Sequence, residues 1–200
     1  MDTGIVVGPG GLVIHQLADS PAVRLDLFVD YLCPFCKRFS DRNLATLQQL
    51  VDQEHAQLVI HPVAFLDRFS KGTEYSTRTA GAAYAAATLA PDRYLAFNQT
   101  LFANQPREGT TCLDDAELAA LATDAGLPDQ TVKQLTDHKY LELALQATRD
   151  AIDLGVQGTP CLVATRSELI QELWDGETPI PAMVRRIAEL PDSSVNSTAK

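Results

Sequence analysis

Hydrophobic residues follow two patterns along the chain, one typical of β-strands and one typical of α-helices. Short apolar runs between turn residues predict β-strands, and these runs cover 4–7, 12–15, 23–29, 57–63, 161–165 and 169–173. The first two runs, separated by Gly-Pro-Gly-Gly, predict a hairpin at a sheet edge. The third and fourth runs flank a helical pattern and form a βαβ unit, which implies parallel strands. The pattern therefore predicts an α/β fold.

Between the second core strand and the run at 161–165, only helical patterns occur. An alanine-rich segment at 79–90, which Pro91 ends, predicts a helix that another helix can approach closely. Asp114 and Glu117 have the spacing of a capping box, and Gly126 is placed to end that helix. An apolar stripe indicates one further helix in this region, at Leu141, Leu145, Thr148 and Ile152. A second stripe indicates a closing helix after the last strand, at Ile180, Met183, Val184, Ile187 and Leu190.

The sequence Cys33-Pro34-Phe35-Cys36 directly follows the strand at 23–29 and stands where the next helix begins. With Cys33 at the N-cap, Pro34 takes the first helical position, where its fixed φ fits and its missing N–H costs nothing. The unpaired amides and the positive end of the helix dipole favour a thiolate at Cys33. We therefore expect Cys33 to be an exposed nucleophile with a lowered pKa and Cys36 to be the resolving thiol.

A Cys-x-x-Cys pair can also be half of a zinc site or a pair of buried small residues. A structural zinc site needs a second pair of ligands at short spacing. The other cysteines, Cys112 and Cys161, stand alone, and the four histidines show no paired arrangement. The strand before the motif and the helix after it favour a thiol-disulfide redox centre without a metal.

A second informative site is Gly158-Thr159-Pro160, where an X-Pro bond before a strand could be cis. With the two-cysteine motif, this arrangement resembles the DsbA-like family of thiol-disulfide oxidoreductases over nearly the whole chain. The resemblance implies a thioredoxin-like fold with an all-helical insertion between the second core strand and the cis-Pro loop. It also implies that Phe35, Thr159 and Pro160 bind substrate, because the backbone beside the cis-proline pairs with extended segments in this family.

On this resemblance the chain divides into four parts. Residues 1–72 are the N-terminal part of the thioredoxin-like domain, and they contain the two catalytic cysteines. Residues 73–154 are the helical insertion domain, and 155–190 are the C-terminal part of the thioredoxin-like domain. We expect 191–200, which are rich in Ser, Asn and Thr, to be a disordered tail.

Three interpretations stay open for Cys112 and Cys161. They form a structural disulfide between the insertion and the sheet, they are two free buried thiols, or Cys161 is a redox-sensitive thiol near the centre. Asp30 either relays a proton to Cys36 or caps the turn, and we favour the turn cap. His61 shows no partner in the sequence and is interpreted as structural.

The residues around the cysteines set expectations for the redox chemistry. Phe35 brings neither charge nor hydrogen bond to the motif, so we expect a weaker oxidant than the strongly oxidising members of the family. Lys37 and Arg38 could support the Cys33 thiolate, but we favour the interpretation that they are a solvated first turn of helix.

Charge and hydropathy exclude several classes of function. A net charge of −10, a pI near 4.7 and the lack of a Lys/Arg cluster argue against nucleic-acid or anionic-lipid partners. No apolar run approaches the roughly 18 residues of a membrane-spanning helix. The start Met1-Asp2-Thr3 lacks the features of a signal peptide. We therefore expect a cytoplasmic protein, or an exported one if a leader has been removed.

The sequence thus predicts a monomeric or weakly dimeric thiol-disulfide oxidoreductase that reduces mixed or protein disulfides in the cytosol. Its partners are protein thiols or disulfides and a redox partner protein or small thiol. Residues 62–67 and 75–78 resemble actinobacterial DsbA-like proteins, which suggests mycothiol, with glutathione as the other low-molecular-weight thiol. No further cofactor is implied. The alternatives are an exported oxidase, a redox-inactive peptide-binding module or holdase, and an isomerase or transferase of the same fold.

Overall fold

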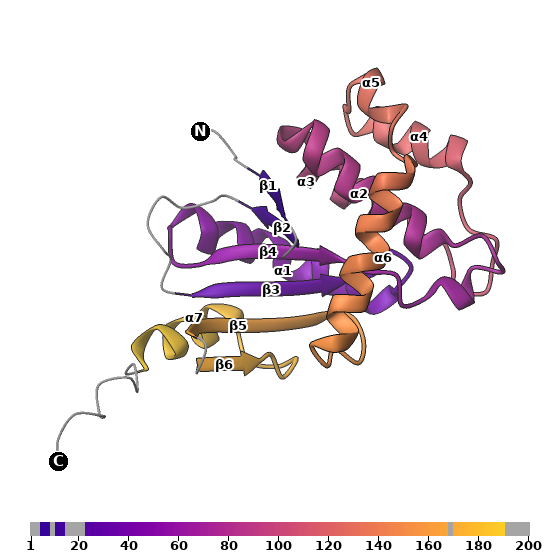
Figure 1. Ribbon diagram of the computed structural model, residues 1–200. Coiled ribbons are helices and arrows are strands. Elements are labelled where there is room, and N and C mark those ends of the chain that lie inside the picture. Colours follow the sequence, from indigo (N-terminus) through magenta and orange to yellow (C-terminus); the bar gives the residue numbers. More distant parts are fainter. Residues whose placement is uncertain (1–4, 9–10, 15–22, 168–169, 191–200) are drawn as a thin grey trace, which may run out of the picture.

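The computed structural model describes residues 5–8, 11–14, 23–167 and 170–190 and contains one six-stranded mixed sheet (Figure 1). The spatial order of the strands is β1-β2-β4-β3-β5-β6. Their bounds are β1 (Ile5–Gly8), β2 (Gly11–Ile14), β3 (Arg24–Val29), β4 (Gln57–Pro62), β5 (Cys161–Ser167) and β6 (Ile170–Leu173). The expected tail at 191–200 lies outside the described residues. So does one end residue of each of three predicted strands, at 4, 15 and 169.

The predicted βαβ unit forms the centre of the sheet. β3 and β4 are parallel neighbours, with Leu25 opposite Leu58, and helix α1 (Pro34–Asp52) connects them. β5 pairs antiparallel with β3, and β6 is the hairpin partner of β5. β1 and β2 form the edge hairpin next to β4. The prediction of a thioredoxin-like α/β fold is confirmed.

The two faces of the sheet are covered by different helices. Leu25, Leu27 and Val29 of β3 belong to the main hydrophobic core, together with residues of α1 and of α7 (Ile180–Glu189). Phe28 points to the other face, where it packs with Val63 and with Ala151 of α6 (His138–Asp153). Figure 1 shows α1 and α7 behind the sheet and α6 in front of it. Successive side chains of β3 thus point to opposite faces of the sheet, as they do in any β-strand.

The helical segment lies between β4 and β5, as predicted. One continuous core contains residues of its helices, the central strands, α1 and α7. The insertion therefore shares its core with the thioredoxin-like part, and the division into domains at 72/73 and 154/155 stays a prediction from sequence. Its elements are the 3₁₀ turn η1 (Asp67–Phe69), α2 (Tyr75–Leu89), α3 (Pro91–Ala103), α4 (Asp115–Asp124), α5 (Asp129–Val132) and α6.

The alanine-rich helix α2 is packed closely against α6. A Cβ atom added at Gly81 would lie 2.8 Å from the side chain of Leu141 and 3.3 Å from its backbone nitrogen. These distances are shorter than ordinary van der Waals contact, so a larger residue here would require Leu141 to shift. The prediction that another helix approaches α2 closely is confirmed.

Two details of the helical predictions are wrong. The alanine-rich helix begins at Tyr75 and not at 79, because Asp67 accepts a hydrogen bond from the amide of Thr77 in its first turn. In α6 the large side chains of the predicted stripe are only half-buried or, at Ile152, exposed. The buried residues are Tyr140, Ala144 and Ala151. Two of these three are alanines, and Ala151 packs with Phe28 and Val63 on the sheet.

The helix ends follow the sequence signals. The carboxylate of Asp114 accepts a hydrogen bond from the Glu117 amide at 2.9 Å, and the Glu117 carboxylate accepts one from the Asp114 amide at 2.8 Å. Gly126 follows α4 with a φ of 82°. The predicted capping box and glycine stop are confirmed.

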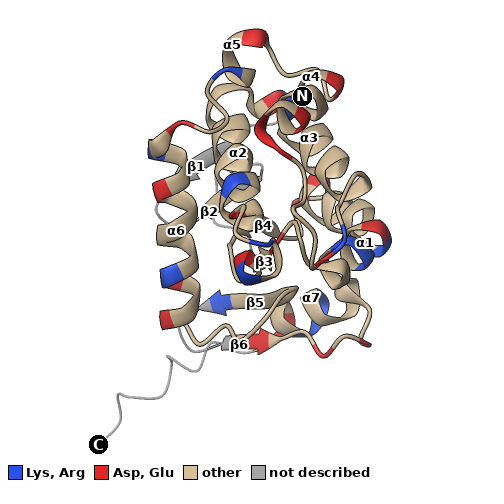
Figure 2. Ribbon diagram, turned by 90° about the vertical axis from the view of Figure 1, so that its right-hand side faces the viewer, with Lys and Arg blue, Asp and Glu red and all other residues tan. Residues whose placement is uncertain are grey.

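Charged residues of both signs are interspersed on the helices. In Figure 2, Lys and Arg alternate with Asp and Glu along α1 and α6. In the described part of the chain, no helix is both long and apolar enough to cross a bilayer.

The close packing of α2 on α6 predicts the effect of one substitution. Gly81→Val should lower the free energy of unfolding by about 1–3 kcal/mol, because the added atoms overlap Leu141. Ala120→Val, at an exposed position of α4, measures the cost of valine in a helix without that overlap. Urea unfolding of both variants tests this expectation, and equal losses would contradict it.

Candidate active site

The two cysteines lie where β3 runs into α1. β3 ends at Val29, and a turn closed by a hydrogen bond from the Cys33 amide to the Asp30 carbonyl leads into the helix. Cys33 is the N-cap in an extended conformation (φ −74°, ψ 117°), and Pro34 is the first helical residue. The local structure predicted for the motif is confirmed.

The two thiols have opposite pKa shifts. The pKa of Cys33 is lowered to about 6, chiefly because the Cys36 thiol donates a hydrogen bond to its sulfur, while burial opposes the shift. Neither the Phe35 nor the Cys36 amide makes a full cap hydrogen bond to this sulfur, but both face it and stabilise negative charge. Burial raises the pKa of Cys36 well above its ordinary value. These opposite shifts agree with the expected roles of Cys33 as nucleophile and Cys36 as resolving thiol, which stay predictions.

Cys33 is less accessible than expected. The residue is only 5% exposed, so the prediction of an exposed nucleophile is wrong. Its sulfur lies 3.2 Å from the carbonyl oxygen of Thr159, on a loop that is brought across from a distant part of the chain. Cys33 and this loop line one groove.

The Thr159–Pro160 peptide bond is cis, as the sequence suggested. Thr159 and Phe35 both line a groove beside Cys33 with a volume of about 540 Å³. Phe35 is 60% exposed at the groove. Pro160, which was also expected to bind substrate, is half-buried and is not among the residues that line the groove. Other lining residues are Phe65, Leu66, Arg68 and Ile152.

Asp30 is a fully buried carboxylate beneath the cysteines. One carboxylate oxygen accepts hydrogen bonds of 2.8 Å from the Leu32 amide and the Ser76 hydroxyl, and the other accepts from the Leu66 amide at 3.0 Å. The amide of Asp30 lies 3.4 Å from the Cys36 sulfur. Burial raises the pKa of Asp30 to about 7. The turn-capping interpretation is confirmed, and a proton relay to Cys36 stays a prediction.

Lys37 does not belong to a solvated first turn. Its ammonium group donates a hydrogen bond to the Phe102 carbonyl at the end of α3, at 2.6 Å. This interpretation was wrong because the partner belongs to the helical segment, far away in the sequence. Arg38 is exposed, and its guanidinium lies 4.4 Å from the centre of the Phe35 ring.

One residue at the site had no signal in the sequence. The side-chain nitrogen of Gln105, just after α3, donates hydrogen bonds to the carbonyl oxygens of Tyr31 and Cys33, at 2.8 and 2.9 Å. A glutamine in a loop does not by itself indicate any particular contact. Gln105 lies beside the redox turn only because the fold brings the two segments together.

Cys112 and Cys161 are not joined by a disulfide. Both thiols are free and half-buried, so the structural disulfide is not present. The interpretation as two free thiols is correct, except that neither thiol is fully buried. Cys112 contacts Thr110, whereas Cys161 packs against the cluster of Phe28 and Val63 on the sheet. A redox-sensitive role of Cys161 stays a prediction.

His61 has a partner that the sequence did not reveal. Its Nε2 atom lies 2.7 Å from the Asp26 carboxylate, and its ring stacks on Phe28 at 4.3 Å. Asp26 also pairs with Arg24. Within the described ranges, no group of three or more His, Cys, Asp or Glu residues is placed to hold a metal ion.

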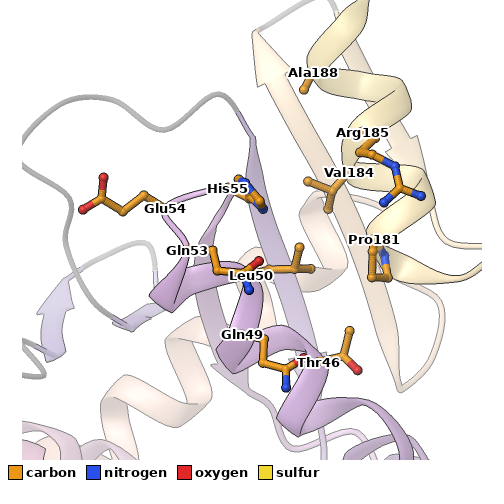
Figure 3. A pocket seen from close by; sticks show the side chains of 10 residues that line it. All are labelled: Thr46, Gln49, Leu50, Gln53, Glu54, His55, Pro181, Val184, Arg185 and Ala188. Carbon is orange, nitrogen blue, oxygen red and sulfur yellow. The ribbon is translucent and has the colours of Figure 1, made fainter.

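A separate cavity of about 380 Å³ lies between the end of α1 and α7 (Figure 3). Leu50 and Val184 supply apolar surface, and His55 and Arg185 supply polar groups. None of its lining residues is a cysteine or a neighbour of the redox motif, so it is not part of the redox site.

Comparison with known proteins places this geometry in a family. The family model described as DSBA-like thioredoxin domain matches residues 24–188. The chain belongs to this family. A protein of known structure that resembles the chain is named as a disulfide bond oxidoreductase, and the family is that of the DsbA-like thiol-disulfide oxidoreductases.

Relatives of this DSBA-like protein include a much longer one. The chain is 33% identical over 160 residues to the serine/threonine-protein kinase PknE of Mycobacterium tuberculosis, a match that covers 76% of this chain. The match covers only 26% of the kinase, so the chain spans about a quarter of the length of the curated relatives it matches.

Solved structures of DsbA-like proteins are similar over almost the whole chain. Oxidised DsbA of M. tuberculosis matches with a TM-score of 0.72 and 26% identity, covering 94% of this chain and 93% of that one. The reduced disulfide oxidoreductase DsbG of the same organism gives the same TM-score and identity, covering 94% and 88%. BdbD of Bacillus subtilis, at 19% identity and a TM-score of 0.74, covers 93% and 97% and shows the shared fold.

The hydrogen bond between the two sulfurs predicts how Cys33 titrates. Cys36→Ala should raise the pKa of Cys33 from about 6 towards that of an ordinary thiol, because the main donor to the thiolate is lost. Thiolate absorbance near 240 nm against pH, in the reduced protein, measures the change. Cys112→Ala is the matched control and should leave the pKa of Cys33 unchanged. An unshifted Cys36→Ala variant would show that the amides alone hold the thiolate.

The buried Asp30 predicts a pH dependence of stability. Its pKa is raised from 3.8 to about 7, so between these pH values the folded protein binds a proton that the unfolded chain releases. Stability should therefore fall as the pH rises from 4 to 7, by up to about 4 kcal/mol from this group. Asp30→Asn should lack this slope.

Urea unfolding at several pH values tests this, with both proteins carrying Cys33→Ser so that the thiolate adds no slope. Asp92→Asn, at an exposed site, is the control and should keep the slope. Identical pH profiles with and without Asp30 would disprove the raised pKa.

Proposed function

We propose that this chain is a reductase of mixed or protein disulfides, with Cys33 as the attacking thiolate. The observation that carries the proposal is the motif itself, in which the uncharged Phe35 gives the Cys33 thiolate no charged partner, and the pKa of Cys33, lowered to about 6, agrees with it. The pKa of the attacking thiol in such motifs ranges from about 7 in thioredoxin, a reductant, to about 3.5 in DsbA, a strong oxidant. A pKa of about 6 lies nearer the reducing end, which agrees with the uncharged Phe35 between the cysteines.

The reaction proceeds by two thiol-disulfide exchanges. The Cys33 thiolate attacks one sulfur of the substrate disulfide, forms a mixed disulfide and releases the other substrate sulfur as a thiolate. Cys36 then loses its proton and attacks Cys33, which releases the second substrate thiolate. The substrate gains two electrons, and the enzyme is left with a Cys33–Cys36 disulfide.

The groove supports the binding of extended apolar segments. Phe35 and Ile152 line it and are 60% and 58% exposed, so they offer apolar surface in the groove that contains Cys33. The Thr159 carbonyl, 3.2 Å from the Cys33 sulfur, is a backbone acceptor next to the point of attack. An extended substrate backbone can pair here by strand addition.

The enzyme disulfide must be reduced again after each turnover. We propose that a low-molecular-weight thiol such as mycothiol or glutathione supplies the two electrons in the cytosol, two thiol molecules becoming one disulfide. A groove of about 540 Å³ has the size of a small-molecule site. The similarity of residues 62–67 and 75–78 to actinobacterial proteins favours mycothiol.

One observation favours a second candidate, an exported oxidase that introduces disulfides into secreted proteins. This is the likeness to DsbA of M. tuberculosis over 94% of the chain. In the two candidates the same cysteines transfer electrons in opposite directions. The reduction potential of the Cys33–Cys36 pair therefore distinguishes them.

The reductase proposal predicts a reduction potential of roughly −200 to −250 mV, since the pKa of Cys33 lies between those of thioredoxin and DsbA. Equilibration with a glutathione redox buffer, followed by thiol trapping, measures the potential. A potential near −120 mV would overturn the reductase in favour of the oxidase.

Cys33→Ser should abolish the reduction of a chromogenic aromatic disulfide, because the attacking sulfur is lost. Cys112→Ser, which changes a thiol outside the groove, should keep full activity. A Cys33→Ser variant that still suppresses aggregation of an unfolded protein as well as the wild type would point to a holdase.

A further inference from the structure

The end of helix α3 contacts the redox turn at several points. The Lys37 ammonium donates to the Phe102 carbonyl, and the Tyr31 hydroxyl donates to the Asn98 side chain at 2.9 Å. The rings of Tyr31 and Phe102 lie 4.9 Å apart. The helical segment thus holds both ends of the stretch from Tyr31 to Lys37, which contains the two cysteines.

Gln105 makes the most direct of these contacts. Its half-buried carboxamide donates to the carbonyl oxygens of Tyr31 (2.8 Å) and Cys33 (2.9 Å), on either side of Leu32. A carboxamide nitrogen has two hydrogens, so it can satisfy both oxygens at once. The amides of Cys36 and Lys37 also donate to the Cys33 carbonyl, at 3.0 and 3.3 Å.

These carbonyl groups matter for the charge on Cys33. Both belong to the turn that bears the sulfur, so one donor that binds both holds the backbone of this turn in place. It also holds Cys33 in the extended N-cap conformation in which the first amides of α1 face the sulfur.

We propose that Gln105 is a positioning residue of the redox centre, whose carboxamide fixes the Cys33 turn in the conformation that stabilises the thiolate. The proposal rests on disulfide exchange at Cys33 and is independent of the direction in which electrons flow. It gives the helical segment a part in the chemistry of the thioredoxin-like part, through one side chain.

Gln105→Met tests the proposal, because methionine keeps the length of the side chain and removes both donors. We expect the pKa of Cys33 to rise by roughly 0.5–1 unit, the worth of one to two ordinary hydrogen bonds. The Cys33–Cys36 potential should become about 15–30 mV more negative, since tenfold in the equilibrium constant corresponds to 29.6 mV. Gln105→Glu, which adds a negative charge and removes the donors, should shift both quantities further in the same direction.

Asn104→Ala is the matched control. Asn104 is the neighbouring residue, is exposed, and donates only within its own helix, to the Thr100 carbonyl. This variant should leave the pKa and the potential unchanged. Urea unfolding of all variants separates a loss of stability from a change at the sulfur.

Three results would overturn the proposal. One is a Gln105→Met protein that is less stable but has the wild-type pKa and potential, because Gln105 would then be purely structural. Another is an equal shift in Asn104→Ala, and the third is a Gln105→Met chain that fails to fold. A wild-type potential near −120 mV would contradict the reductase proposal and leave the comparison between variants intact.

Discussion

The redox centre depends on the different surroundings of its two sulfurs. The nearby Cys36 thiol is the largest cause of the lowered pKa of Cys33, because it can donate a hydrogen bond to the thiolate. The helix creates the asymmetry, since Cys33 stands at the N-cap beside the groove and Cys36 stands one turn further in, where it has no solvent exposure. Burial keeps the proton on Cys36, so the donor persists while Cys33 is ionised.

Local features of this site could be predicted from the sequence, because they depend on neighbouring residues. The apolar strand, the proline at the first helical position and the spacing of the cysteines set the structure of the motif, and the resemblance to DsbA-like proteins pointed to the cis-Pro loop. The partners of the motif could not be predicted. Thr159 covers the Cys33 sulfur across 126 positions of sequence, and Gln105 reaches the turn from 72 positions away.

The same distinction explains the errors in the fold. The strands and capping signals were read correctly because they are local, but the buried face of α6 depends on how closely α2 approaches it. Gly81 lets α2 lie close to α6 at Leu141, and the residues that α6 buries are Tyr140, Ala144 and Ala151. His61 likewise gains its role only when parallel pairing of β3 and β4 brings Asp26 beside it.

The continuous core restricts where members of this architecture can diverge. Twelve of the fifteen residues of α2 are buried, and that helix packs between the sheet and the other helices, so it tolerates little change in length or volume. In α4 only Leu118 and Ala122 of ten residues are buried. A change of length or side-chain volume should therefore cost less stability in α4 than in α2.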